Sequence, residues 1–181
     1  MNLTNLQTYD MSPHGANTKV HSLLINVNNI QKRASEMIDM LNTGSWLEKL
    51  DPVAKFSYEA RAEKTIDKLV KSILSEIKNE VTEEFGEYLV SVSAQDALEL
   101  AFSHIKIPLA EMLKEKIMGN PGFDFHTETS ENLLAFGEAK YSGSVNPYKE
   151  SLEQIRRFIN EKKDNAELVD LQNFISKITV T

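Results

Sequence analysis

Cysteine is absent from the 181 residues of the chain. Its absence excludes a disulfide framework and also excludes metal sites built from thiolates. A bound metal would depend on oxygen ligands or on the four histidines. Such ligands suit hard cations best, so any metal cofactor is expected to be Mg²⁺ or Mn²⁺.

Long apolar runs and several common signature loops are also missing. No segment approaches the roughly 18–20 apolar residues that span a bilayer, and the first residues lack the basic and then apolar pattern of a secretory signal. We therefore expect a cytoplasmic protein with no membrane partner. The glycine-rich loops that bind nucleotide phosphates, the G-x-S-x-G turn of hydrolases and the H-E-x-x-H zinc motif do not occur.

Basic residues are outnumbered, with 20 Lys and Arg against 27 Asp and Glu, which gives a net charge of −7. This balance counts against broad attraction to nucleic acid, because nonspecific binding depends on Lys and Arg that neutralise phosphates. It is compatible with a site that gathers carboxylates around a divalent cation. The length allows one substantial core, or a small catalytic domain with a helical extension.

Residues 1–82 are predicted to form a helical extension. Apolar residues recur at helical spacing over residues 17–41, and Asn42-Thr43-Gly44-Ser45 ends this segment. Asp51-Pro52 is typical of a helix start, and the apolar stripe that follows continues to Val81. We expect the two helices to pack as an antiparallel hairpin that serves as a scaffold or binds a partner.

Residues 83–181 are predicted to form an α+β core. Residues 84–90 could continue a helix, which we favour, or form a strand together with the Val-Ser-Val sequence at their end. Residues 94–102 and the segment from Pro108 are predicted to be helical. After the Gly119-Asn120-Pro121-Gly122 turn the apolar period falls to about two, which predicts a β-hairpin. Its first strand falls within residues 122–129, and its second, over residues 133–141, is apolar enough to be central in a sheet. The remaining expected elements are a helix after Asn146-Pro147 with an apolar stripe at Tyr148, Leu152, Ile155 and Ile159, a short helix over residues 166–175, and a closing strand over residues 178–180.

Three ionisable residues of the predicted hairpin form the candidate active centre. Glu138 and Lys140 are two residues apart on one strand, so both side chains leave the same face of the sheet, and the hairpin places Asp124 beside Glu138. Phosphodiester hydrolysis needs carboxylates that hold one or two divalent metals. A lysine can orient the attacking water or stabilise charge on the phosphate. The alternatives are a Glu/Lys ion pair on an edge strand, or two side chains whose ends reach solvent where the strand finishes at Tyr141-Ser142-Gly143.

The order of Asp124 and Glu138-Ala139-Lys140 resembles the motif of the PD-(D/E)XK nucleases. The resemblance covers the chain from about Glu83 onward and implies a restriction-endonuclease-like core, with Asp124 and Glu138 as metal ligands and Lys140 as the catalytic lysine. A narrower resemblance is to the nuclease subunit of Hachiman-type bacterial anti-phage systems, which implies a DNA-cleaving protein of antiviral defence that works with a helicase subunit. The segments that carry it are Glu84-Phe85-Gly86-Glu87, Pro108-Leu109-Ala110-Glu111, Gly122-Phe123-Asp124-Phe125-His126 and Phe136-Gly137-Glu138-Ala139-Lys140-Tyr141.

The nuclease resemblance also implies a further metal-binding glutamate on a helix of the core, for which Glu87 and Glu111 are the candidates. Glu87 is preferred because Gly86 leaves room near the sheet, and a solvent-exposed helical glutamate is the alternative for each. His126 lies two residues after Asp124 and is expected on the same face. There it either contacts metal, water or phosphate, or packs within the hairpin.

The helix after Pro147 carries the predicted contacts to DNA phosphates, namely Gln154, Arg156 and Arg157. The exonuclease branch of the superfamily often has Q-x-x-x-Y on this helix. Here Gln154 is followed four residues later by Phe158, and this departure argues against exonuclease action.

We therefore expect a Mg²⁺- or Mn²⁺-dependent deoxyribonuclease whose partners are DNA and a helicase or other protein subunit. The alternative is a catalytically silent nuclease-like subunit that binds a partner through its N-terminal helices. The choices between DNA and RNA, between endo- and exonuclease action, and between a monomer and a homo-oligomer stay open.

Overall fold

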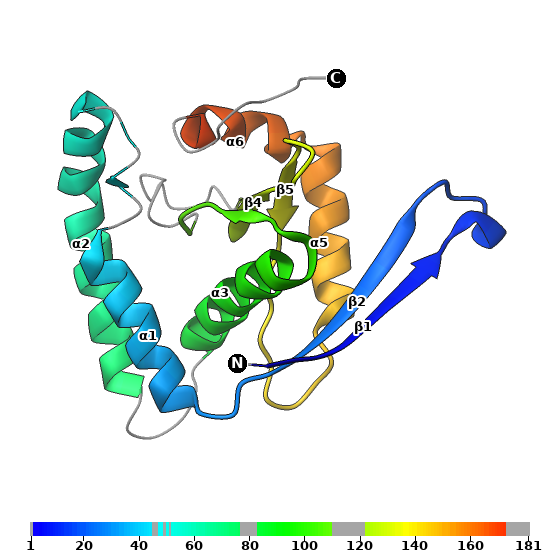
Figure 1. Ribbon diagram of the computed structural model, residues 1–181, viewed down its shortest axis with the longest axis horizontal. Helices are drawn as coiled ribbons and strands as arrows, with labels where there is room; N and C mark the ends of the chain where they lie inside the picture. Colours follow the sequence, from blue (N-terminus) through cyan, green and yellow to red (C-terminus); the bar gives the residue numbers. More distant parts are fainter. Residues whose placement is uncertain are drawn as a thin grey trace.

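The computed structural model describes residues 2–44, 47–48, 50, 52–76, 83–109 and 122–172, which form an α+β fold with two small antiparallel sheets (Figure 1). The expected helix after Pro108 and the expected strand over residues 178–180 lie outside the described residues. None of the described helices is long and apolar enough to cross a membrane. The elements are, in chain order, β1 (Asn2–Asp10), η1 (Ser12–His14), β2 (Lys19–Asn26), α1 (Ile30–Thr43), α2 (Pro52–Glu76), α3 (Glu83–Phe102), β3 (Ile105–Lys106), β4 (Phe125–Glu128), β5 (Leu134–Gly137), α5 (Tyr148–Asn160) and α6 (Lys163–Leu171).

The N-terminal segment is a long β-hairpin of β1 and β2, which extends away from the rest of the described chain (Figure 1). The predicted helix over residues 17–41 is therefore wrong in its first half. Leu23 and Ile25 are half-buried on one side of β2, and Leu23 pairs with Leu6 of β1. The apolar spacing in this stretch fits a helix equally well, so pairing with the preceding strand decides its structure.

The first helix begins only at Ile30, after a capping asparagine. The Asn29 side chain accepts a hydrogen bond of 2.8 Å from the Lys32 amide. α2 begins at Pro52, which is the predicted first helical position. α1 and α2 lie side by side and run antiparallel, so the expected helical hairpin is present from α1 onward (Figure 1).

The main hydrophobic cluster is built around α3. Phe85 and Leu89 of α3 pack with Met37 of α1 and Phe125 of β4. Burial of such a side chain contributes roughly 1.5–3 kcal/mol. The cluster thus contains residues from both sides of position 82. The boundary expected there between a helical extension and a core stays a prediction. Its buried members are Ala34, Met37, Leu41, Phe85, Tyr88, Leu89, Val92, Leu109 and Phe125.

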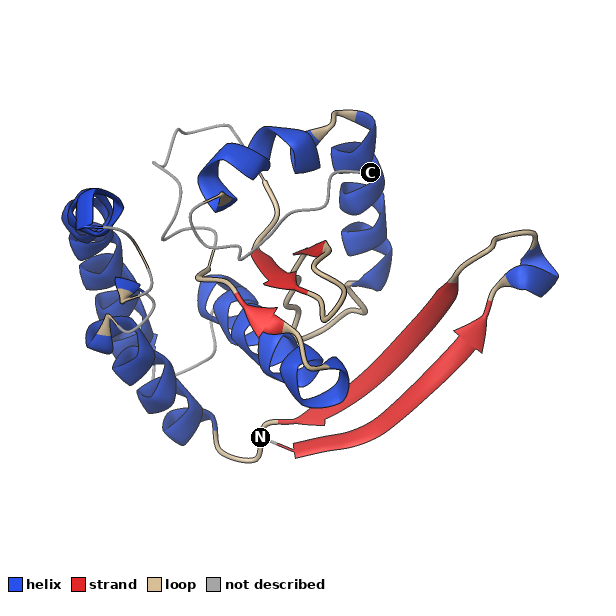
Figure 2. Ribbon diagram, turned by 45° about the horizontal axis from the view of Figure 1, so that its top comes forward, coloured by secondary structure: helices blue, strands red, loops and turns tan. Residues whose placement is uncertain are grey.

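The second sheet has β4 as its middle strand, between β3 and β5. The later strand of the hairpin is therefore not the central one in the described sheet. All four residues of β4 are buried, because α3 packs on one face of the sheet while α5 and α6 lie on the other (Figure 2). Gly137 of β5 pairs with Phe125, whose ring occupies the place of a side chain: a Cβ on Gly137 would lie 2.1 Å from Phe125 Cζ.

A buried glutamine joins α3 to this sheet. The Gln95 amide nitrogen donates to the carbonyl oxygens of Ile107, at 2.6 Å, and of His126, at 3.0 Å. Because buried carbonyls need a donor, these two bonds favour one placement of the helix against the strands.

α5 begins after Pro147, as predicted, but it buries a different face from the expected stripe. Tyr148 and Leu152 are 73% and 66% exposed, whereas Phe158 is fully buried against Phe123, with ring centroids 5.1 Å apart. Apolar residues occur on both sides of this helix, so their periodicity could not identify the buried side. The next helix, α6, starts at Lys163 rather than at residue 166.

Candidate functional site

The β4–β5 hairpin brings Asp124 next to the segment that carries Glu138 and Lys140. The Asp124 amide donates to the Gly137 carbonyl at 2.9 Å, and the Ala139 amide donates to Asp124 Oδ2 at 2.7 Å. Glu138 and Lys140 were expected within the second strand, but β5 ends at Gly137 and both residues follow it. The Asp124 carboxylate thereby fixes the chain that leaves β5.

Glu87 of α3 joins this group through Lys140. Lys140 Nζ lies 3.0 Å from Glu138 Oε1 and 3.2 Å from Glu87 Oε1. Gly86 allows α3 to lie this close to the segment after β5, because a Cβ at Gly86 would lie 2.1 Å from Cγ of the Tyr141 ring. Of the two candidate helical glutamates, the structure therefore brings Glu87 to the site. Glu111 lies outside the described residues.

The Glu138 carboxylate is unusually placed for a charged group. Its side chain has 0% exposure, and apart from the Lys140 ammonium neither oxygen contacts a hydrogen-bond donor among the described residues. Burial, followed by the negative charge of Asp124, raises the pKa of Glu138 to about 7, although Lys140 partly offsets both effects. This carboxyl group consequently changes charge near neutral pH.

Lys140 is the positive member of the cluster. Its side chain is 15% exposed, and burial by itself lowers the pKa of the ammonium group. The carboxylates of Glu138 and Glu87 outweigh burial, so the net pKa is raised. Lys140 therefore stays protonated at neutral pH, which makes it a source of positive charge rather than a base.

The chemistry of these side chains fits a hard divalent cation. In the positions described, no three Asp, Glu or His side chains lie close enough together to form a complete metal cage. The Glu138 carboxylate is nevertheless a buried anion whose negative neighbours disfavour its charge, and a bound cation would compensate that charge. Asp124 and Glu87 are the other carboxylates whose negative charges raise its pKa, and they could supply further oxygen ligands.

His126 is packed in the hairpin instead of facing the carboxylates. It has 0% exposure, and its Nε2 lies 2.7 Å from Glu167 Oε2 on α6. The expectation that His126 contacts metal or phosphate therefore does not match this structure. The sequence analysis did not identify its partner, Glu167. Glu167 lies four residues before Leu171 on α6, so both side chains leave the same, buried side of this short helix, and that spacing is the signal that could have indicated it.

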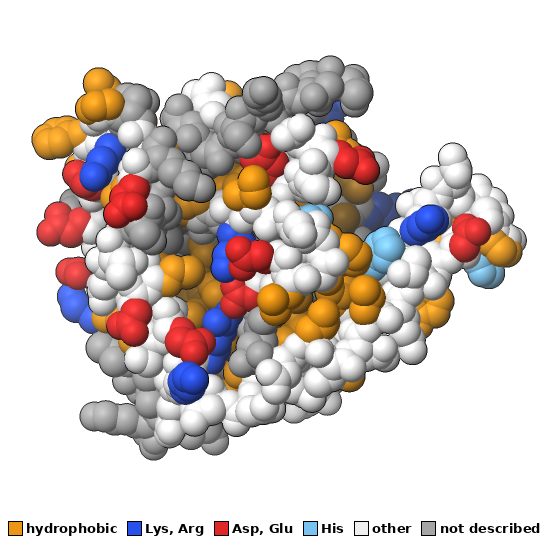
Figure 3. Space-filling view, in the orientation of Figure 1, with side chains coloured by type: hydrophobic (Ala, Val, Ile, Leu, Met, Phe, Trp, Pro, Cys, Tyr) orange, Lys and Arg blue, Asp and Glu red, His pale blue; other side chains and the backbone are white. Residues whose placement is uncertain are grey.

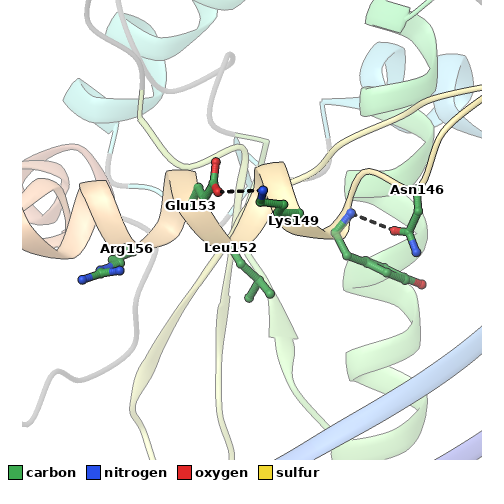
Figure 4. A pocket seen from close by; sticks show the side chains of 6 residues that line it. Asn146, Lys149, Leu152, Glu153 and Arg156 are labelled. Carbon is green, nitrogen blue, oxygen red and sulfur yellow. Dashed lines mark hydrogen bonds and ion pairs between the residues drawn. The ribbon is translucent and has the colours of Figure 1, made fainter.

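The three predicted phosphate contacts lie on α5. Gln154 is half-buried, while Arg156 and Arg157 are exposed. Arg156 lines an open hollow on the outer face of the helix together with Leu152, Lys149 and Glu153, and the last two form an ion pair of 3.8 Å (Figure 4). Asp124, Glu138, Lys140 and Glu87 are not among the residues that line this hollow.

Charge on the described surface is mixed. On the face shown in Figure 3, basic and acidic side chains are interspersed, and no broad basic patch is seen there.

Comparison of the chain with protein-family models, with curated proteins and with solved structures finds no match.

Proposed function

We propose that this chain is a Mg²⁺- or Mn²⁺-dependent nuclease that hydrolyses phosphodiester bonds in DNA. The observation that carries the proposal is the Glu138 carboxylate, which is fully buried, lies beside Asp124 and Lys140, and has a pKa of about 7. Burying a carboxylate among other negative groups is costly, and perturbed carboxylates of this kind are concentrated at functional sites.

The proposed core is restriction-endonuclease-like. In support, α3, the β4–β5 hairpin and α5 follow the order of helix, antiparallel strands and helix that the resemblance to PD-(D/E)XK nucleases implies. The hydrogen bond from the Ala139 amide to Asp124 supports the same core, since it joins the motif aspartate to the middle of the Glu138-Ala139-Lys140 motif. We further propose, on the narrower resemblance, a role in anti-phage defence beside a helicase subunit.

The carboxylates and the lysine of the cluster have different roles in this proposal. Asp124, Glu138 and Glu87 would hold the cation, which would supply an activated water and neutralise charge on the phosphate. Lys140 remains protonated and orients the attacking water or stabilises negative charge on the phosphate oxygens. Asp124 also fixes the backbone next to Glu138 through the Ala139 amide.

Plasmid nicking in the presence of Mn²⁺ or Mg²⁺ tests the proposal. Lys140→Ala and Glu138→Ala are expected to lower the rate by about 100-fold or more, because each removes a charge that acts on the reacting groups. Lys71→Ala is the matched control, since Lys71 is 80% exposed on α2, away from the predicted phosphate contacts on α5, and its rate should equal that of the wild type. Equal nicking by the wild type and Lys140→Ala would overturn the proposal.

A second candidate function is a catalytically silent subunit that binds a partner protein through its N-terminal helices. The observation that favours it is the exposure of Val53 and Phe56, at 79% and 77%, on adjacent turns of α2. Loss of a co-purified partner on Val53→Asp with Phe56→Asp, together with no cleavage by the wild type, would support this candidate. Cleavage by the purified monomer alone would argue against it.

A further inference from the structure

Glu167 of α6 makes two hydrogen bonds to the start of β4. Its Oε1 accepts from the Phe123 amide at 2.9 Å, and its Oε2 lies 2.7 Å from His126 Nε2. Glu167 is 5% exposed and His126 is fully buried, so water does not compete strongly for these contacts. One carboxylate therefore holds the chain on both sides of Asp124.

Asp124 is the residue that this double contact encloses. It follows Phe123 directly and precedes His126 by two positions, and its own carboxylate accepts from the Ala139 amide at 2.7 Å. The Phe123 ring packs between Phe136 and Phe158, with centroids 5.0 and 5.1 Å away. Ring packing can hold the segment in place. The directional bond at the Phe123 amide fixes the peptide plane that leads into Phe123, and the Asp124 amide, which donates to the Gly137 carbonyl at 2.9 Å, fixes the next plane.

We propose that Glu167 is a positioning residue that directs the Asp124 carboxylate toward the Ala139 amide and the Glu138 side chain. The consequence for metal binding rests on the proposed function, whereas the positioning itself does not. A buried carboxylate is a poor source of stability, because apolar residues of similar size often replace buried ionic groups without loss. Glu167 instead holds Asp124 in one defined orientation.

Hydrogen exchange of the Ala139 amide in the full chain measures the positioning directly. Glu167→Leu keeps much of the side-chain volume but removes both bonds, and we expect the Ala139 amide to exchange about tenfold faster through local opening. Glu167→Gln keeps an acceptor for the Phe123 amide, and its rate should stay within about threefold of the wild type. Met37→Ala is the control, because it weakens the buried cluster at α1 but leaves both Glu167 bonds in place.

Unchanged exchange at Ala139 in Glu167→Leu would overturn the inference, and so would an equal increase in Glu167→Gln. An increase in Met37→Ala of the same size would assign the effect to general destabilisation and would also overturn it. A Mn²⁺ titration separates this inference from the proposed function. If the wild type binds Mn²⁺, Glu167→Leu should bind it about tenfold more weakly and Glu167→Gln nearly normally. If the wild type binds none, the proposed function fails while the exchange result still decides the positioning.

Discussion

Glu87 and Lys140 are 53 positions apart in the chain, and their side chains meet at 3.2 Å. The contact joins the first half of α3 to the segment that follows β5. Lys140 also lies 3.0 Å from Glu138, so a single ammonium group bridges two carboxylates. A cation bound by these carboxylates would therefore have to share their negative charge with Lys140.

Metal binding should depend on pH through Glu138. The pKa of this carboxyl group is raised to about 7, and a carboxylate must lose its proton before it binds a cation. Mn²⁺ affinity should rise by about tenfold per pH unit below that pKa and level off above it. Calorimetry in buffers of different ionisation enthalpy should detect close to one proton released at pH 6. No proton release at that pH would contradict the assignment of Glu138 as a ligand.

Stability without metal should fall as pH rises, because of the same group. The Glu138 pKa is higher in the folded protein than its ordinary value of 4.5, so the neutral carboxyl favours the fold. This contribution is complete below pH 4.5 and is lost as pH rises to about 7, with a total of roughly 3 kcal/mol. Glu138→Gln should flatten this part of the stability profile in urea titrations. If Glu138→Gln loses as much stability as the wild type over the same pH range, the pH dependence comes from other groups.

Gly86→Ala should destabilise the protein, although alanine favours helices over glycine by about 1 kcal/mol. The added Cβ would lie 2.1 Å from the Tyr141 ring, so the ring or the helix must move. We expect a net loss of roughly 1–3 kcal/mol and weaker Mn²⁺ binding. Gly143→Ala is the control, since a Cβ there meets nothing within 4 Å. Tyr141→Ala should relieve the strain, and a double-mutant cycle that shows no coupling would rule out this explanation.

Arg33→Ala should lower the free energy of unfolding by more than the removal of an ordinary surface charge does. The Arg33 side chain is 10% exposed and pairs with Asp96 of α3, which is 18% exposed. Removing one partner of such a pair leaves a poorly solvated charge, and we expect a loss of about 2–3 kcal/mol in the free energy of unfolding. Lys106 also lies 2.9 Å from Asp96 and limits the effect. Lys55→Ala, which breaks an exposed pair with Glu59, should change stability by less than about 0.5 kcal/mol in the same measurement.

Local patterns in the sequence predicted some elements well. Pro52 and Pro147 marked helix starts correctly, because proline fits the first helical turn through its fixed φ and missing amide hydrogen. The turn-forming sequence Gly119-Asn120-Pro121-Gly122 and the change of apolar period after it predicted the hairpin of β4 and β5. These signals depend only on neighbouring residues, which is why a single sequence suffices to find them.

Non-local contacts account for the features that were missed. β2 was predicted as helix because its partner β1 is needed to distinguish the two patterns, and no local signal carries that pairing. The burial of Phe158 rather than Leu152 depends on Phe123 across the fold. The bond between Glu167 and His126 likewise joins residues 41 positions apart, so the sequence could not indicate which partner would bury this histidine.

The packing of α1 against α3 limits how far the chain can be truncated from its N-terminus and still fold. The motif residues all follow position 83, yet Met37 and Leu41 cover the side of α3 that carries Phe85 and Leu89. A fragment cut at that position would expose this apolar side to water and would leave Glu87 on a helix without support. The N-terminal helices are therefore required for a properly formed site.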